Sequence, residues 1–273
     1  MIHKIMGPYS NSETLQRIQS ALEAARAVLA GFTAGDIEAK YKAGDDPVTA
    51  ADHAVDAVLR KNLLRDGEGW LSEETVDDPS RLEKSRVWVV DPLDGTREFV
   101  QGIPEFCVSI AMVKNGIPVA GGICNPATQE TFIGSLETGV SYNGQPAAPS
   151  QRTSLEGSLV LASRSEVKRG EWDAFKGTSL NVKAMGSVAY KLALVSAGLA
   201  DVTFTLTPKN EWDVAAGAAL VMSAGGHVQT LENTPLRCNR KDPLLSGLIA
   251  CGPHLRDELV SLLSDHVQPA TRR

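Results

Sequence analysis

The feature of this sequence that most constrains the fold is a short buried strand that runs directly into two aspartates. Residues 86–90 form an apolar, β-branched run of strand length, and residues 91–96 (DPLDGT) follow at once. The chain must therefore bring two carboxylates, a carbonyl and a hydroxyl into one tight turn, where Gly95 allows unusual backbone angles.

Two carboxylates so close together repel each other unless cations neutralise them. Ligands that are all oxygen atoms suit Mg²⁺, which proteins hold with few carboxylates while phosphate and water complete its shell. The alternative is an Asx turn, in which Asp91 and Asp94 cap local backbone groups. For this segment taken alone, the Asx turn is the favoured interpretation.

Two further acidic positions shift the interpretation from an Asx turn toward a metal site. Glu73 lies in WLSEET (residues 70–75), just after an apolar pair, and Asp213 opens a predicted helix in EWDVAAG (residues 211–217). Taken singly, Glu73 is better explained as a solvated loop charge and Asp213 as a helix N-cap. Their significance depends on the other motifs that occur with them in the sequence.

The hydrophobic pattern predicts a mixed α and β chain with a break near its middle. Apolar spacing indicates a helix over residues 12–29, and Thr49 with Asp52 three residues later is a capping-box signature for a second helix. Asn115-Gly116 is a strong hairpin signal between two apolar runs. Strands are predicted at residues 86–90, 106–113, 117–124, 131–135 and 140–142 in the first half.

The second half alternates strands with helices. The predicted order is strand 158–162, helix 187–197, strand 200–206, helix 213–224, strand 248–251 and a last helix to about residue 264. The polar stretch 144–154 is the best candidate boundary. We therefore expect an N-terminal α+β subdomain, residues 1–150, with most of the acidic ligands, and a C-terminal α/β subdomain, residues 151–273, with Asp213 and substrate contacts.

Composition narrows the class of protein further. Of 273 residues, 42% are hydrophobic and 22% are charged, which excludes a disordered chain, and the net charge of −6 argues against a nucleic-acid polymer as partner. No run approaches the roughly 18 apolar residues of a membrane span, and the first ten residues read as a short leader without a signal-peptide core. We expect a cytoplasmic protein without membrane contact. Its four isolated cysteines, at 107, 124, 238 and 251, are predicted to be buried reduced thiols.

The motifs in combination closely resemble the inositol monophosphatase superfamily of Mg²⁺-dependent, lithium-sensitive phosphatases. VTxxD at residues 48–52, Glu73-Glu74, DPxDGTxxF at 91–99 and WDxAAG at 212–217 occur in family order, and the resemblance covers roughly residues 12–260. It implies a layered α-β-α-β-α sandwich, as in inositol monophosphatase and fructose-1,6-bisphosphatase. Family relatives are commonly homodimers, so a homodimer is possible. The Lys-Ser/Thr of a P-loop, a GxSxG elbow, HExxH and GxGxxG after a strand do not occur.

The resemblance also implies roles for individual residues. One Mg²⁺ would be held by Glu73, Asp91 and the carbonyl of Leu93, a second by Asp91, Asp94 and Asp213, and a third, looser ion by Glu73. Thr96 would position the attacking water and Asp52 would bond to Thr96, so the implied catalytic residues are Thr96, Asp52 and Glu73. The implied substrate contacts are Gly95, Thr96, Arg164, Ser187, Lys191 and Asp213. Two such ions clamp the attacking and leaving oxygens and lower the pKa of a bound water.

The substrate is harder to predict than the reaction. Inositol-specific members carry an acidic residue about seven positions before the last aspartate, whereas this chain has Leu206 there. The PxNxWD stretch at 208–213, Arg97-Glu98-Phe99 and ASRS at 162–165 instead resemble the 3'(2'),5'-bisphosphate nucleotidase branch. Arg164 and Lys191 are candidates for holding a second phosphate, the alternative being solvated surface charges.

The small phosphorylated metabolite is therefore expected to be 3'-phosphoadenosine 5'-phosphate. The alternatives are an inositol, sugar or polyol monophosphate, histidinol phosphate included, and a phosphate-binding regulatory relative without turnover. The complete set of acidic ligands favours an enzyme.

Overall fold

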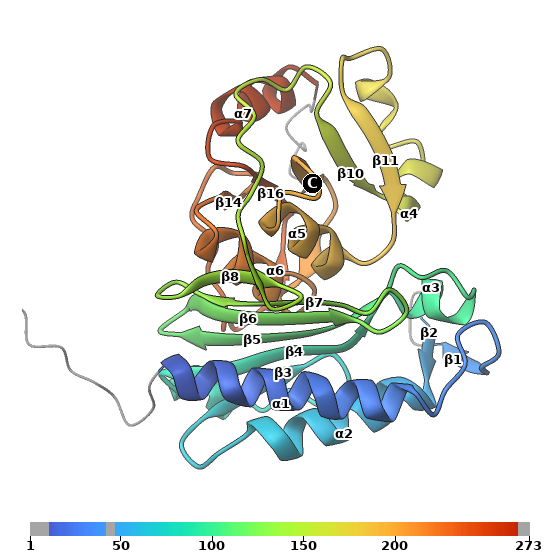
Figure 1. Cartoon of the computed structure of the whole chain (residues 1–273), viewed down its shortest axis with the longest axis vertical. Coiled ribbons are helices and arrows are strands. Elements are labelled where there is room, and N and C mark those ends of the chain that lie inside the picture. Colours follow the sequence, from blue (N-terminus) through green and yellow to red (C-terminus); the bar gives the residue numbers. More distant parts are fainter. Residues whose placement is uncertain (1–10, 42–46, 267–273) are drawn as a thin grey trace, which may run out of the picture.

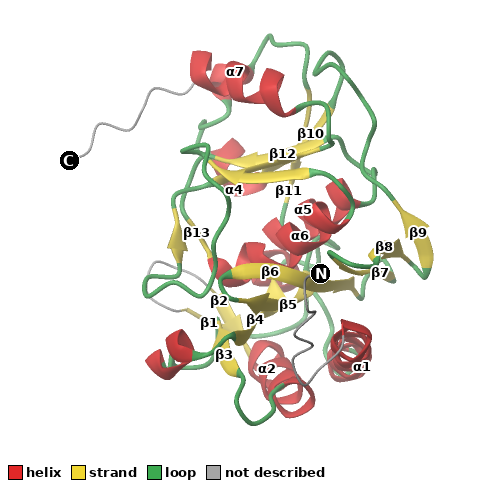
Figure 2. Ribbon diagram, turned by 90° about the vertical axis from the view of Figure 1, so that its left-hand side faces the viewer, coloured by secondary structure: helices red, strands yellow, loops and turns green. Residues whose placement is uncertain are grey.

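Five alternating layers of helix and sheet make up the computed structural model, which describes residues 11–41 and 47–266 (Figures 1 and 2). The predicted α-β-α-β-α sandwich is confirmed. The predicted N-terminal leader lies outside the described residues. No helix of the described ranges is long and apolar enough to cross a membrane.

The first helical layer is a pair of helices that covers one face of the larger sheet. Residues of α1 and α2 pack with that sheet in one cluster that includes Leu22, Leu59 and Trp88. The capping box predicted at the start of α2 is present, since Thr49 and Asp52 bond reciprocally. The α-helices are α1 (Asn11–Leu29), α2 (Ala50–Leu63), α3 (Thr96–Val100), α4 (Arg164–Lys168), α5 (Val188–Ser196), α6 (Glu211–Ser223) and α7 (Arg256–His266). Short 3-10 helices span Pro79–Glu83 (η1) and Asp173–Phe175 (η2).

The larger sheet has seven strands in the order β3-β4-β5-β6-β7-β8-β9. Only the β3–β4 pair is parallel. The predicted hairpin joins β5 to β6, where Asn115 and Gly116 both have positive φ. The strands are β3 (Gly69–Ser72), β4 (Arg86–Asp94), β5 (Cys107–Lys114), β6 (Ile117–Asn125), β7 (Glu130–Ser135), β8 (Gly139–Tyr142) and β9 (Gln145–Ala147).

The smaller sheet has five strands in the order β11-β10-β12-β16-β14 and mixes parallel with antiparallel pairs. The strands are β10 (Leu159–Ser163), β11 (Asn181–Met185), β12 (Val202–Thr205), β14 (His227–Thr230) and β16 (Leu248–Cys251). Two further pairs complete the described strands: β1 (Ala39–Tyr41) with β2 (Pro47–Thr49), and β13 (Lys209–Asn210) with β15 (Leu244–Leu245).

Helices α5 and α6 form the middle layer, between the two sheets (Figure 2). They are buried on nearly all sides, which explains why their sequences are almost uniformly apolar. The outer face of the smaller sheet is covered by α7 together with the aromatic pair Trp172 and Phe175. All four cysteines are buried and unpaired, as predicted.

Two local predictions need correction. The strand expected to end at residue 90 continues to Asp94, with a shift in its pairing to β5 between Asp91 and Asp94. Pro92 lies within that shift and has no N–H to give to the ladder. The helix expected to open at Asp213 begins at Glu211 with Asn210 as N-cap, so Asp213 occupies the third helical position and is not an N-cap.

Candidate active site

One pocket of about 310 Å³ gathers almost every residue that the sequence singles out. It is formed where the end of β4 meets the first residues of four helices, α3, α4, α5 and α6. The predicted site residues that line it are Glu73, Asp91, Leu93, Asp94, Gly95, Thr96, Arg164, Ser187, Lys191 and Asp213. Asp52 does not line the pocket, but its carboxylate accepts a hydrogen bond from the Thr96 hydroxyl.

Three carboxylates meet at one wall of this pocket. Ligand oxygens of Glu73, Asp91 and Asp213 all lie within 4.8 Å of one another. Burial, together with the nearby charges of Glu73, Asp94 and Asp213, raises the pKa of Asp91 well above its ordinary value. Burial and the charges of Asp94 and Glu73 likewise raise the pKa of Asp213. Such a cluster favours either protons or a divalent cation.

Asp94 is oriented by the opposite half of the chain. Its Oδ2 accepts hydrogen bonds from Ser187 Oγ at 2.7 Å and from the Ala189 N–H at 2.6 Å. Burial raises the pKa of Asp94, although these two hydrogen bonds and the charge of Lys191 oppose the rise. The Asx-turn alternative holds for Asp91, whose Oδ1 accepts the Leu93 N–H at 2.9 Å, but Asp94 caps no local group.

The hydroxyl of Thr96 lies between two acceptors. Thr96 Oγ1 is 2.9 Å from Asp52 Oδ1 and 2.9 Å from the carbonyl oxygen of Leu93. The other oxygen of Asp52 accepts the N–H of Thr49 at 2.8 Å and its hydroxyl at 2.6 Å. The capping box of α2 thus fixes the carboxylate that contacts Thr96.

A second capping box positions Asp213. The Asn210 N–H donates to Asp213 Oδ2 at 2.9 Å, while Glu211 accepts the backbone N–H groups of Asn239 and Arg240. Burial raises the pKa of Glu211 to about 7. The first turn of α6 is therefore held from two sides, and Asp213 points toward the acids of β4.

The two candidate cations have different environments. Lys191 is 3% exposed, so the surface-charge alternative is wrong for it. Its Nζ contacts the carbonyl oxygens of Met185, Gly186 and Ser187 at 2.9 to 3.4 Å, and burial lowers its pKa to about 8. Arg164 is more exposed.

The guanidinium of Arg164 is shared between two carboxylates. Arg164 Nη2 pairs with Glu105, and Arg164 Nε lies 3.6 Å from Glu98. A substrate anion at Arg164 therefore meets a charge that is already compensated.

Three residues at or near the site are not among the predicted site residues. Glu98 lies within the DPxDGTxxF motif and lines the pocket, and Lys209 lines the pocket while pairing with Glu166 at 3.2 Å. Glu105 approaches the turn at Gly186, 81 positions along the chain. No spacing rule predicts so distant a contact.

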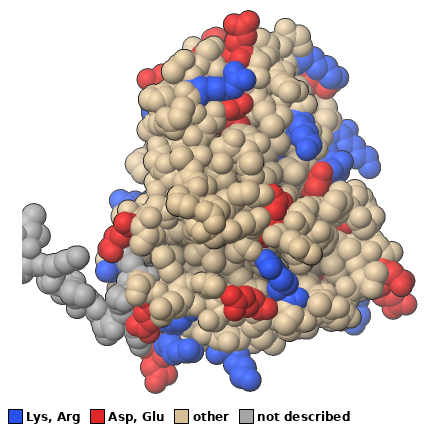
Figure 3. Space-filling view, viewed as in Figure 1, with Lys and Arg blue, Asp and Glu red and all other residues tan. Residues whose placement is uncertain are grey.

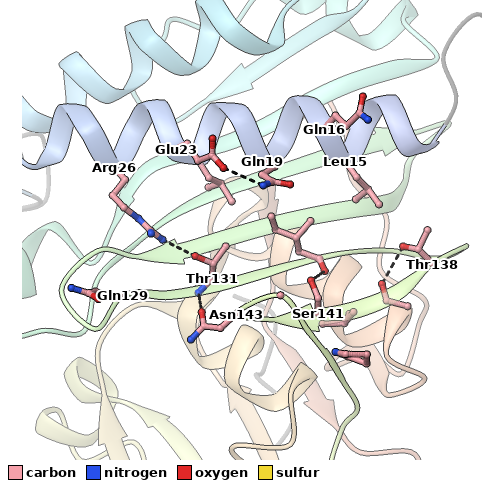
Figure 4. A pocket seen from close by; sticks show the side chains of 16 residues that line it. Leu15, Gln16, Gln19, Glu23, Arg26, Gln129, Thr131, Thr138, Ser141 and Asn143 are labelled. Carbon is pink, nitrogen blue, oxygen red and sulfur yellow. Dashed lines mark hydrogen bonds between the residues drawn. The ribbon is translucent and has the colours of Figure 1, made fainter.

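A larger cavity of about 700 Å³ lies elsewhere, between α1 and the strands β7 and β8 (Figure 4). Several of its polar side chains are hydrogen-bonded: Arg26 Nη2 with Thr131, Gln19 with Glu23, and Asn143 with the Thr131 N–H. The cavity gathers none of the predicted site residues. On the face shown in Figure 3, acidic and basic side chains lie interspersed.

Comparisons with known proteins agree on one family. The sequence profile of the inositol monophosphatase family matches residues 10–268. The inositol-1-monophosphatase of Mesorhizobium japonicum is 33% identical over 86% of this chain and 89% of its own length. The 3'-phosphoadenosine 5'-phosphate phosphatase of Mycobacterium bovis is 31% identical over 81% of this chain and 84% of its own. The solved inositol monophosphatase of Anabaena is 30% identical, with a TM-score of 0.79 over 96% of this chain and 99% of that one.

Proposed function

Because this chain belongs to the inositol monophosphatase family and is a metal-dependent phosphoric monoester hydrolase, we propose that its substrate carries a second anionic group. The best candidate is 3'-phosphoadenosine 5'-phosphate, hydrolysed to AMP. The observation that carries this choice is Lys191, a buried ammonium that lines the pocket and has no carboxylate within ion-pair distance among the described residues. A buried cation that has no direct ion pair favours an anionic ligand.

The acidic cluster fits Mg²⁺ in its donor chemistry. Its carboxylate oxygens are hard ligands. Burial and mutual repulsion raise the pKa values of Asp91 and Asp213, and a divalent cation relieves the repulsion. Glu73, Asp91, Asp94, Asp213 and the Leu93 carbonyl would hold two to three such ions. When bound, they supply charge neutralisation and an activated water. We also expect Li⁺ to inhibit, as the family resemblance implies.

The chain's own residues orient the nucleophile. When the Thr96 hydroxyl donates its hydrogen bond to Asp52, the lone pairs of its oxygen remain available to accept a hydrogen bond from the attacking water. Asp52 is held by both donors of Thr49, which fixes the position of one of the two acceptors of the Thr96 hydroxyl. The N–H groups at Gly95 and Thr96 open α3 beside the pocket, where phosphate oxygens would be received.

A second candidate substrate is a polyol monophosphate. Glu98 lines the pocket, and its carboxylate is an acceptor for ring hydroxyls, whereas Leu206 packs with the outer hydrophobic cluster and offers none. Arg164 lies beside Glu98 and offsets part of its charge. The family relatives include enzymes named for both kinds of substrate.

Phosphate release from a matched panel tests the choice. We expect kcat/KM for 3'-phosphoadenosine 5'-phosphate to exceed that for inositol 1-phosphate, fructose 1,6-bisphosphate and histidinol phosphate at equal Mg²⁺. Faster hydrolysis of inositol 1-phosphate would favour the polyol substrate. No hydrolysis of any of the four would favour a phosphate-binding relative that lacks turnover on these compounds.

A further inference from the structure

We propose that Glu105 is a positioning residue that holds the Gly186–Ser187 turn against Asp94, and that Arg164 acts through Glu105 and does not bind the substrate. The inference rests on phosphate-ester hydrolysis at this site, but on no particular substrate. Glu105 lies in the loop between α3 and β5, outside the motifs that identify the family.

The side chain of Glu105 contacts the second half of the chain at Gly186 and Arg164. Its Oε2 accepts the Gly186 N–H at 2.7 Å and pairs with Arg164 Nη2. Gly186 is buried, and this hydrogen bond satisfies its N–H. The carboxylate is therefore a direct link between the loop after α3 and the turn that precedes α5.

The backbone of Glu105 fixes the other end of the link. Gly95 has a φ of +98°, and a Cβ at that position would lie 2.8 Å from the carbonyl oxygen of Glu105. The residue before Thr96 thus packs directly on the residue that holds Gly186. A displacement of Glu105 would therefore move both the Gly95 turn and the Gly186 turn.

The turn that Glu105 holds is strained and has a role in the site. Ser187 has a φ of +52°, a strained conformation for a residue with a side chain. Such a conformation persists only when surrounding contacts enforce it. From it, Ser187 Oγ and the Ala189 N–H both donate to Asp94. The position of Asp94 therefore depends on a turn that Glu105 helps to hold.

Arg164 stabilises the position of the Glu105 carboxylate by an ion pair. Besides Glu105 it approaches Glu98, whose side chain packs so closely on Gly186 that a Cβ there would lie 2.3 Å from Glu98 Cδ. Two carboxylates flank one guanidinium, and both carboxylates contact the same glycine. This geometry explains Arg164 without a substrate phosphate.

The test compares three replacements of Glu105. In Glu105→Gln the amide oxygen can still accept the Gly186 N–H, while Glu105→Asp keeps the charge but is one methylene too short, and Glu105→Ala loses both features. We expect Glu105→Asp and Glu105→Ala to lower kcat about 10- to 100-fold, with KM changed less than about threefold. The Glu105→Gln variant should retain most of the activity. Glu137→Ala, an exposed glutamate on the β7–β8 connection, is the matched control.

Two further measurements do not depend on turnover or on the identity of the substrate. Hydrogen exchange of the amides of residues 186–189 should accelerate in Glu105→Asp and Glu105→Ala, and remain slow in Glu105→Gln. Arg164→Ala should lower kcat equally for each hydrolysed substrate, and should have no further effect when added to Glu105→Ala.

Other results would overturn the proposal. Unchanged exchange and unchanged kcat in Glu105→Ala would remove the positioning role. A rise in KM confined to the doubly anionic substrate in Arg164→Ala would make Arg164 a substrate ligand. A preference of the wild-type enzyme for inositol 1-phosphate would change the proposed substrate and leave this inference intact, because each variant is compared with wild type on the same substrate.

Discussion

The two halves of the molecule supply the site in different ways. The larger sheet delivers Asp91 and Asp94 from one strand, β4, whose last eight residues are all buried, and places Thr96 two residues after it. The smaller sheet and its helices deliver Asp213, Ser187 and Lys191 from helix starts and from a strained turn. The first half therefore fixes Asp91 and Asp94 on one continuous strand. The second half fixes Asp213 and Lys191 by contacts among its own residues, and it also holds Asp94.

This difference predicts two kinds of variant. Changes in the first half should lower kcat for every substrate, since they remove groups that act on the phosphate itself. Changes in the second half, other than at the proposed metal ligand Asp213, should alter the choice of substrate or the placement of first-half groups. The following predictions test that division, in order of decreasing effect.

The largest effect is expected for Asp91→Asn. Asp91 is proposed to contact both tightly held cations, so its loss should lower kcat at least about 10³-fold, as for the loss of a principal electrostatic stabiliser. Activity assays over a range of Mg²⁺ concentrations measure this effect. Near-normal activity in Mg²⁺ would show that Asp91 does not bridge the sites.

Asp91→Asn should also stabilise the metal-free fold. Burial and neighbouring acids raise the pKa of Asp91, so its contribution to stability is greatest at low pH and is lost as pH rises through the raised pKa. Without metal, the variant should melt several degrees higher than wild type at neutral pH and similarly below pH 4. A variant that melts lower at neutral pH would contradict the assigned repulsion.

A smaller effect is expected for Thr96→Ala. Its hydroxyl contacts Asp52 and the Leu93 carbonyl and is not a proposed metal ligand, so kcat should fall about 10²-fold while Mg²⁺ affinity stays nearly constant. Calorimetric titration of Mg²⁺ and steady-state kinetics separate the two quantities. Equal losses of affinity and rate would place Thr96 in the coordination shell.

The Lys191→Met variant tests a proposed substrate contact from the second half of the chain. It should raise KM for 3'-phosphoadenosine 5'-phosphate about tenfold, the scale of one hydrogen bond to a charged group, with a much smaller change for inositol 1-phosphate. The ammonium also contacts three carbonyl oxygens of the 185–187 turn, so melting temperature serves as a check on folding. A loss shared equally by both substrates would assign Lys191 a purely structural role.

The smallest effect is a pH dependence of that same contact. Burial lowers the pKa of Lys191 to about 8, so its positive charge is present below pH 8 and is lost as pH rises above it. KM for the doubly anionic substrate should therefore rise a few-fold between pH 7 and pH 9, whereas KM for inositol 1-phosphate should not. A parallel rise for both substrates would point to another group.

The sequence-based predictions succeed where residues close together in the chain determine the structure. The capping box of Thr49 with Asp52 and the hairpin at Asn115-Gly116 are set by contacts a few residues apart, and both are present as predicted. Short polar strands were missed because their stability comes from distant partners. β11, for example, is largely exposed and is defined only by its parallel pairing with β10.

The predicted site residues converge on one pocket, but their environments could not be predicted. Nothing in the sequence indicates that Lys191 is buried among carbonyl oxygens, since its burial results from α5 lying between two sheets. Glu105 was missed because its contact with Gly186 spans 81 positions. Metal and substrate roles remain predictions from the family motifs.

Asp52 limits how this enzyme can be engineered. One of its oxygens closes the capping box of α2 and the other receives the Thr96 hydroxyl, so a single carboxylate serves helix stability and the proposed reaction. A designer who improved the cap with a longer side chain at position 52 would move the oxygen that faces Thr96. Thermostabilising substitutions are therefore better sought on the solvent side of α1 or α7, where no side chain has this double role.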